Sequence, residues 1–188
     1  DNKISNYLGN NNEFEFSQNL ISEKLRYGEN PHQAGFLYKN NQKYGIANSS
    51  ILSGKKMSYN NYLDADTAFL AVNNFEKNCV AIVKHSNVCG LSVKDDQINA
   101  FKEALKGDPV SAYGGILGFN TDVKGNVAKE IIKNFFEIII APQYDEDALN
   151  ILKSKKNLRI LESNFENTKD YSLRSISGGF LAQSQNIS

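Results

Sequence analysis

Apolar and polar positions follow an irregular pattern at first and a regular one from about residue 64. Between residues 64 and 77 the apolar side chains recur at helical spacing, which predicts a helix. The run from Cys79 to Val83 is continuously apolar, which is typical of a strand buried on both faces. Expected strands and helices then alternate to about residue 162. This alternation predicts a three-layer α/β domain with a largely parallel or mixed sheet.

The remaining elements are expected from the same pattern and from turn residues. Helices are expected over residues 95–106, 127–133 and 145–155, and strands over residues 35–38, 116–119, 135–140, 158–161 and 180–182. Asp95 can cap the first of these helices and Gly107 can end it. Residues 39–59 are polar and rich in Gly, Ser and Asn, so we expect an irregular stretch there. Residues 1–24 have the composition of a linker.

Charge and cysteine content narrow the class of protein. Lysine plus arginine and aspartate plus glutamate each total 21, and this balance argues against broad nucleic-acid binding. Two cysteines are too few for a disulfide framework, so we expect a reduced, cytoplasmic setting. No apolar run approaches the roughly 20 residues that a membrane span needs. The first residue is Asp1, so the chain is expected to begin inside a longer protein.

The end of the buried strand carries the first candidate for chemistry. Lys84 and His85 stand side by side there and could supply a cation and a titratable base. Because neighbouring residues of a strand point to opposite faces, both can reach one ligand only if the chain bends after Val83. Gly90 and the polar residues before it permit such a bend. The alternative is a solvated lysine and a loop histidine without a role.

Three further segments are each ambiguous when taken alone. Residues 26–33 (Arg-Tyr-Gly-Glu-Asn-Pro-His-Gln) offer a guanidinium for a phosphate or carboxylate, or form a polar surface loop. Residues 107–115 (Gly-Asp-Pro-Val-Ser-Ala-Tyr-Gly-Gly) let the backbone approach a ligand, or simply connect two elements. Residues 56–61 (Lys-Met-Ser-Tyr-Asn-Asn) could read a base or sugar, although helix capping explains them better. Ligands of open α/β sheets lie beyond strand carboxyl ends, so we expect the site after strands 79–83 and 116–119 and at loop 107–115.

The residues do not predict metal catalysis. Zinc deaminases need a His/Cys-x-Glu segment and a Pro-Cys-x-x-Cys segment. The histidines are His32 and His85, and Cys79 and Cys89 lie far outside Cys-x-x-Cys spacing. A Cys89 nucleophile paired with His85 is conceivable, but nothing in the spacing singles it out.

Taken together and in this order, the four segments resemble the AICAR transformylase region of the bifunctional purine-biosynthesis enzyme, where AICAR is aminoimidazole carboxamide ribotide. The likeness runs through Lys-His-Ser-Asn-Val-Cys-Gly at 84–90, continues at 139–142 and 158–162, and covers about residues 25–183. The resemblance implies a cytidine-deaminase-like α/β/α fold with a mixed sheet and no zinc. It also implies that residues 1–24 link to a missing cyclohydrolase domain. Residues 25–188 would then be the first part of a transformylase domain whose C-terminal half is missing.

The same resemblance implies an activity and its partners. A formyl group would pass from 10-formyltetrahydrofolate, the co-substrate, to the amino group of AICAR. The parent would be a phosphoribosylaminoimidazolecarboxamide formyltransferase that is also an IMP cyclohydrolase and a homodimer. Neither nucleic acid nor a membrane is an expected partner. Two alternatives stay open: a non-catalytic nucleotide-binding domain of the same fold, and a fragment that is inactive alone.

Site residues carry over from the resemblance position by position. They form a catalytic pair, a pair of nucleotide contacts and three further substrate-binding positions: Lys84 and His85; Arg26 and Tyr27; Asn61, Gly114 and Glu137. Three features depart from the family pattern, and one of them is that residues 178–185 (Gly-Gly-Phe-Leu-Ala-Gln-Ser-Gln) lack the acidic residue often found after the Gln, so this end is assigned no function. Val88 replaces the usual proline, which removes a fixed φ from that loop, and Tyr113 replaces the usual phenylalanine.

Overall fold

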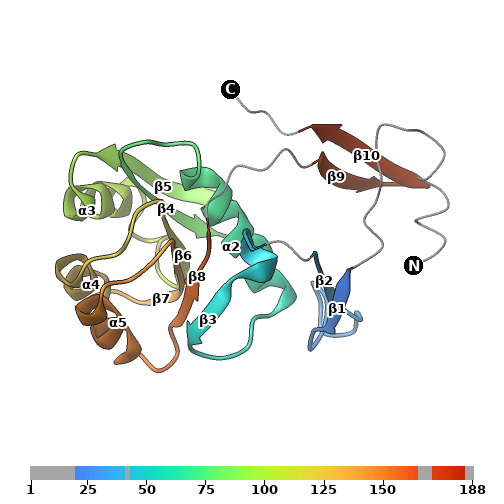
Figure 1. Cartoon of the computed structure of the whole chain (residues 1–188), viewed down its shortest axis with the longest axis horizontal. Helices are drawn as coiled ribbons and strands as arrows, with labels where there is room; N and C mark the ends of the chain where they lie inside the picture. The colour runs from blue at the N-terminus through green and yellow to red at the C-terminus, as the bar shows by residue number, and fades with distance from the viewer. Residues whose placement is uncertain (1–19, 41–42, 165–170, 185–188) are drawn as a thin grey trace.

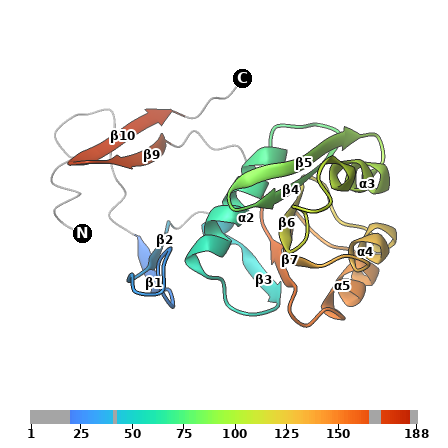
Figure 2. The same ribbon diagram turned by 180° about the vertical axis from the view of Figure 1, so that it is seen from behind.

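The main body is a six-stranded mixed sheet between two layers of helices (Figure 1), in a computed structural model that describes residues 20–40, 43–164 and 171–184. The strands, in their order across the sheet, are β3 (Ser50–Ser53), β8 (Arg159–Glu162), β7 (Phe136–Ala141), β6 (Gly115–Phe119), β4 (Asn78–Lys84) and β5 (Asn87–Lys94). Helix α2 (Tyr59–Val72) covers one face. The other face is covered by α3 (Gln97–Gly107), α4 (Gly125–Ile131) and α5 (Glu146–Lys153) (Figure 2). The predicted three-layer α/β architecture with a mixed sheet is confirmed.

Strand direction decides which segments meet at each edge of the sheet. β6, β7 and β8 run parallel to one another, whereas β4 runs antiparallel to β6. The carboxyl end of β4 therefore lies beside the amino ends of the three parallel strands, at an edge that we call the Lys84 edge. The expectation that the segments after strands 79–83 and 116–119 share one site is wrong, because those two strand ends lie at opposite edges. Loop 107–115 leads into β6 at the Lys84 edge, so it lies near the end of β4, and its part in a site stays a prediction.

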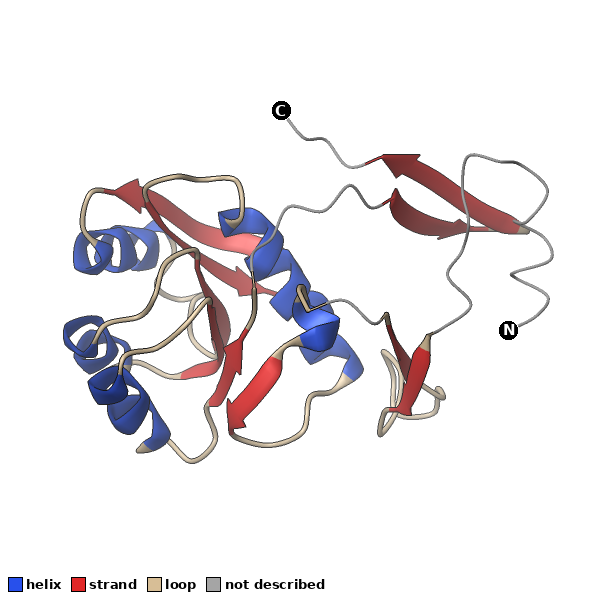
Figure 3. Cartoon of the chain, viewed as in Figure 1, coloured by secondary structure: helices blue, strands red, loops and turns tan. Residues whose placement is uncertain are grey.

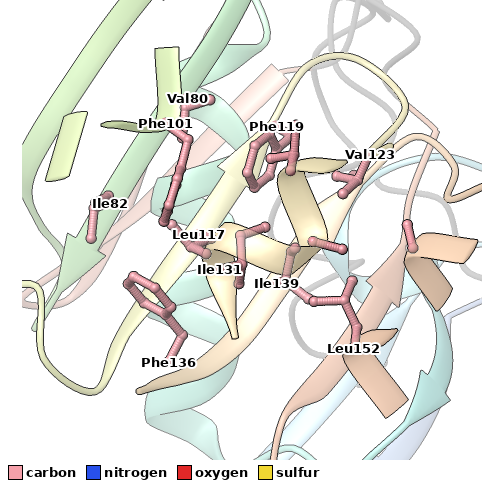
Figure 4. Close-up of a cluster of buried hydrophobic side chains, with 14 of the residues drawn as sticks. Val80, Ile82, Phe101, Leu117, Phe119, Val123, Ile131, Phe136, Ile139 and Leu152 are labelled. Carbon is pink, nitrogen blue, oxygen red and sulfur yellow. The ribbon is translucent and has the colours of Figure 1, made fainter. Parts of the chain in front are cut away.

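Two clusters of buried side chains hold the layers together. On the α2 face, Ala65, Ala68 and Phe69 pack against sheet residues that include Val83 and Ile138. On the other face, side chains from α3, α4 and α5 meet the opposite side of the same strands, and Figure 4 shows part of this cluster. Its largest fully buried members include Phe101, Phe119, Leu117, Ile131, Ile139 and Leu152. Strands buried on both faces explain the continuous apolar runs in the sequence.

Helix starts follow capping residues more closely than they follow apolar spacing. α2 begins five residues before the predicted start, because the hydroxyl of Ser58 accepts from Asn61 N at 3.2 Å in a capping box. α3 is capped by Asp96, which accepts from Asn99 N at 2.8 Å, so the prediction of Asp95 as the cap is wrong. Asp95 instead forms an exposed ion pair with Lys77 at 2.7 Å.

The structure contains strands that the sequence did not predict. β3 lies within the stretch expected to be irregular, and β5 covers residues expected to form a loop. Two hairpins are drawn apart from the six-stranded sheet (Figure 3), namely β1 (Ile21–Lys24) with β2 (Phe36–Lys39), and β9 (Tyr171–Ile176) with β10 (Gly179–Ser184). β2 and β10 confirm the two strands expected in these regions. The expected linker mostly lies outside the described residues.

Asn120, in the loop after β6, binds three backbone groups of segment 75–79. Its Oδ1 accepts from Cys79 N at 2.7 Å, and its Nδ2 donates to Phe75 O and Lys77 O at 2.6 and 2.8 Å. Asn120→Ala is expected to lower the free energy of unfolding by about 1–3 kcal/mol, because the backbone groups lose their partner. Equilibrium urea unfolding measures this change. Asn150→Ala, at an exposed position of α5, is the control, and equal urea midpoints for the two variants would contradict the prediction.

Candidate active site at the Lys84 edge

A two-residue turn joins β4 to β5 and carries one member of the expected catalytic pair. His85 and Ser86 have φ of 53° and 56°, and Lys84 pairs with Asn87 across the hairpin. Two positive φ values at the central positions are typical of a type I′ turn, which usually contains Asn, Asp or Gly. The expected bend is therefore present, but it comes after Lys84 and not directly after Val83.

Asp64, on α2, holds this turn from outside the hairpin. Its Oδ1 accepts from Ser86 N at 2.6 Å and from Ser86 Oγ at 3.0 Å. Within the turn, Asn87 Nδ2 donates to His85 O at 2.9 Å. Sequence reasoning missed Asp64 as a site residue, since its only signal was a place near the start of the expected helix.

The ammonium of Lys84 lies against the Gly-rich loop that precedes β6. Its Nζ donates to Tyr113 O. Gly114 has φ of 70° and its N–H donates to Phe135 O at 2.8 Å. A Cβ at Gly114 would lie 3.8 Å from Lys84 Nζ and 3.3 Å from the Phe135 ring. The structure therefore brings Gly114 and Lys84 together, as the resemblance implied, and glycine adopts the positive φ at this position without strain.

Glu137 and Arg159 lie at the starts of β7 and β8, on the same edge. Glu137 is the extra residue where the β6–β7 pairing shifts register, and its Oε2 is 4.0 Å from Arg159 Nη1. Arg159 Nε donates to Lys55 O at 3.1 Å and more weakly to Lys56 O at 3.4 Å. Arg159 thus joins the expected site residue Glu137 to the segment that precedes α2. Sequence reasoning did not single out Arg159.

The start of α2 holds segment 26–33 near the turn that carries His85. Asn60 Nδ2 donates to Glu29 O at 3.3 Å, which ties segment 26–33 to the helix. Asn60 and Asp64 are four residues apart and therefore share one face of α2, with about 5–6 Å between such Cβ atoms. Segment 26–33 and the His85 turn are consequently neighbours along one helix face.

The expected nucleotide contacts have local partners. Arg26 is exposed and its guanidinium carbon lies 5.6 Å from the centroid of the Tyr27 ring, within cation–π range. Asn61 Oδ1 accepts from Ser58 N at 3.1 Å as part of the capping box. The preference for a capping role in this segment is confirmed, and the Asn61 amide nitrogen is not part of the capping box.

A cavity of about 580 Å³ opens at this edge on the side of α3, α4 and α5. Tyr113 and Phe135 line it, with ring centroids 5.1 Å apart, but its lining does not include Lys84, His85 or Arg26. Lys84, His85 and Arg26 would have to face a common hollow to act on one ligand, and this cavity is not that hollow.

A thiol nucleophile at Cys89 finds little support. Burial raises the pKa of the Cys89 thiol, and its Sγ lies 3.4 Å from Ile82 O as a hydrogen-bond donor, so a thiolate nucleophile is disfavoured. Within residues 20–40, 43–164 and 171–184, no group of three or more His, Cys, Asp or Glu side chains could hold a metal ion.

The same part of the chain contains no helix with the length and apolar character of a membrane span.

Comparison with known proteins supports the family resemblance that the four motifs indicate. A family model described as "AICARFT/IMPCHase bienzyme" matches residues 1–188. The bifunctional purine biosynthesis protein PurH of Aquifex aeolicus is 48% identical over 165 residues, which are 87% of this chain and 32% of the relative. The proteins of that name from Petrotoga mobilis and Dictyostelium discoideum are 46% and 47% identical, over 97% and 86% of this chain and 38% and 31% of their own lengths. The chain thus spans about a third of these relatives, and it belongs to the AICARFT/IMPCHase bienzyme family.

Proposed function

We propose that the protein to which this chain belongs transfers a formyl group from 10-formyltetrahydrofolate to the amino group of AICAR, a step of purine (IMP) biosynthesis. The observation that carries the proposal is the gathering of Lys84, Gly114 and Glu137 at one sheet edge, beside the start of α2. Family membership supports the reaction class.

In the proposed reaction, His85 acts as the base. The amino group of AICAR is a poor nucleophile, because its lone pair is delocalised into a carboxamide-bearing imidazole. Attack on the formyl carbon therefore needs close positioning and removal of a proton. The imidazole of His85, exposed in its turn, accepts that proton directly or through the carboxamide.

Lys84 acts on the formyl donor, whereas His85 acts on the amino group of AICAR. Its ammonium stabilises the oxyanion that develops on the formyl oxygen, or protonates the folate nitrogen as it leaves. The contact with Tyr113 O keeps the long side chain extended toward the Gly-rich loop. Preorganisation of this kind lowers the cost of charge stabilisation during the reaction.

The nucleotide part of AICAR is proposed to bind along the start of α2. Arg26 offers a planar donor fork for the phosphate, and the side chain of Tyr27 adds a hydroxyl. Asn61 and the carboxylate of Glu137 would contact the base or ribose. The contact between Asn60 and Glu29 supports this placement, since it brings segment 26–33 to the helix.

Residues 25–188 are proposed to form the first part of a transformylase domain, in a longer cytoplasmic protein that is also an IMP cyclohydrolase and a homodimer. The coverage of about a third of each relative supports a longer parent. Several large apolar side chains on α2 and β5 are at least two-fifths exposed, which supports burial by the rest of that protein or by a second copy: Leu63, Leu70, Val88 and Leu91.

Formyl transfer by the complete natural protein tests the proposal. Purified protein is incubated with AICAR and 10-formyltetrahydrofolate, and formyl-AICAR is quantified by chromatography. We expect product formation that needs both substrates and no stoichiometric zinc, whereas the 188-residue chain alone is expected to be inactive. AICAR binding without turnover by the complete protein would favour the non-catalytic alternative. Stoichiometric zinc would favour a metal-dependent deaminase.

A further inference from the structure

We infer that Asp64 is a positioning residue for the proposed reaction: it holds the turn that carries His85 in its active conformation. The inference rests on the proposed function, because it assumes that the turn serves to orient His85 for the reaction. The contacts that support it are local and are independent of any ligand.

The backbone conformation of the turn requires support. Both central residues adopt positive φ although neither is glycine, and a side chain makes this region unfavourable. Such conformations persist where surrounding structure over-determines them, and they cluster at functional sites. Within β4–β5, Asn87 Nδ2 supplies one contact to His85 O. If the two residues relaxed to negative φ values, the turn would change shape and the imidazole of His85 would move.

Asp64 supplies the external support. One of its carboxylate oxygens accepts both the N–H and the hydroxyl of Ser86, at 2.6 and 3.0 Å. Hydrogen bonds to an ionised acceptor are shorter and stronger than neutral ones. Both bonds hold the residue next to His85, so they fix the direction in which the turn leaves the strand.

Helix α2 makes this support rigid. The residue next to Asp64, Ala65, is fully buried against the sheet, as is Ala68 one turn later. The carboxylate therefore projects from an element that cannot shift without disturbing the core. The position of His85 is thus fixed relative to α2, the helix that also contacts segment 26–33 through Asn60.

Loss of Asp64 is expected to loosen the turn without unfolding the protein. β4 and β5 are joined by seven paired positions from Asn78–Lys94 to Lys84–Asn87, and Asp64 takes part in none of them. In the complete natural protein, Asp64→Ala should lower kcat for formyl transfer by about a hundredfold, the effect of misplacing a reacting group by about 1 Å. The KM for AICAR should change by less than about threefold, since uniform binding is retained.

A second substitution tests whether the turn conformation is the cause. Glycine adopts positive φ without strain, so Ser86→Gly in the Asp64→Ala background should recover about tenfold in kcat. If Asp64→Ala fails to fold, Asp64→Leu, which has a similar side-chain size and no oxygen acceptor, replaces it. The control is Asp147→Ala, an exposed acidic residue in the first turn of α5 on the opposite face.

Hydrogen exchange gives a readout that does not depend on activity. A peptide covering residues 84–90 should exchange faster in Asp64→Ala than in the unaltered protein, while a peptide from α3 should not. Unchanged exchange, unchanged kcat despite faster exchange, or a rise in KM alone would each overturn the positioning role. If the unaltered protein shows no formyl transfer, the proposed function fails, and faster exchange at 84–90 then supports only a structural role for Asp64.

Discussion

Replacement of His85 by alanine is expected to lower kcat for formyl transfer by about 10²–10⁴-fold, the usual contribution of a positioned general base. His85 is exposed in a turn and makes no contact with a buried cluster, so the fold should not change. AICAR affinity should stay nearly intact, because the proposed nucleotide contacts come from other segments. Steady-state kinetics and isothermal titration with AICAR on the complete protein measure the two quantities separately.

The control for His85→Ala is Asn150→Ala, which alters an exposed residue of α5 on the opposite side of the sheet. Turnover and affinity should both be unchanged in this control. Lost AICAR binding with unchanged turnover at saturation would show that His85 binds substrate and is not the base. A kcat near that of the unaltered protein would remove His85 from the reaction altogether.

The largest expected effect on stability comes from Gly90→Ala. Gly90 lies in β5 under α3, and a Cβ there would stand 2.1 Å from Ala104 O, a backbone atom of that helix. The helix cannot yield without leaving the cluster that holds Ala100 and Phe101. We expect the free energy of unfolding to fall by about 3 kcal/mol or more, at the upper end of the cost of overpacking.

Urea unfolding followed by circular dichroism measures the effect of Gly90→Ala. Gly179→Ala is the matched control, since a Cβ at Gly179 meets nothing within 4 Å. The control should unfold at nearly the same urea concentration as the unaltered chain. A Gly90→Ala midpoint equal to that of the control would show that α3 can move away from β5 at little cost.

The sequence predicted the interior of the sheet better than its edges. β4 and β7 were predicted because strands covered on both faces are continuously apolar. β5 was missed because it is an edge strand whose burial is mixed, with Asn87 and Gly90 among its residues. The pairing of β5 depends on β4 and on the turn between them, which no local pattern in β5 records.

The candidate site was predictable only where its residues lie in a recognisable motif. The resemblance placed Lys84 and Gly114 in one site, and the structure brings them together. Asp64 and Arg159 were missed because their contacts join positions that are 22 and about 100 residues apart in the chain. The direction of β4 was missed for the same reason, since strand direction is set by pairing with β6.

Asn60 and Asp64 lie on one face of α2, and this limits insertions and deletions in the helix between them. Asn60 and Asp64 are separated by about 6 Å of helix rise, and one added residue between them would turn one relative to the other by about 100°. Segment 26–33 and the His85 turn would then contact different sides of the helix. Insertions and deletions should therefore be absent between these two positions in active members of the family.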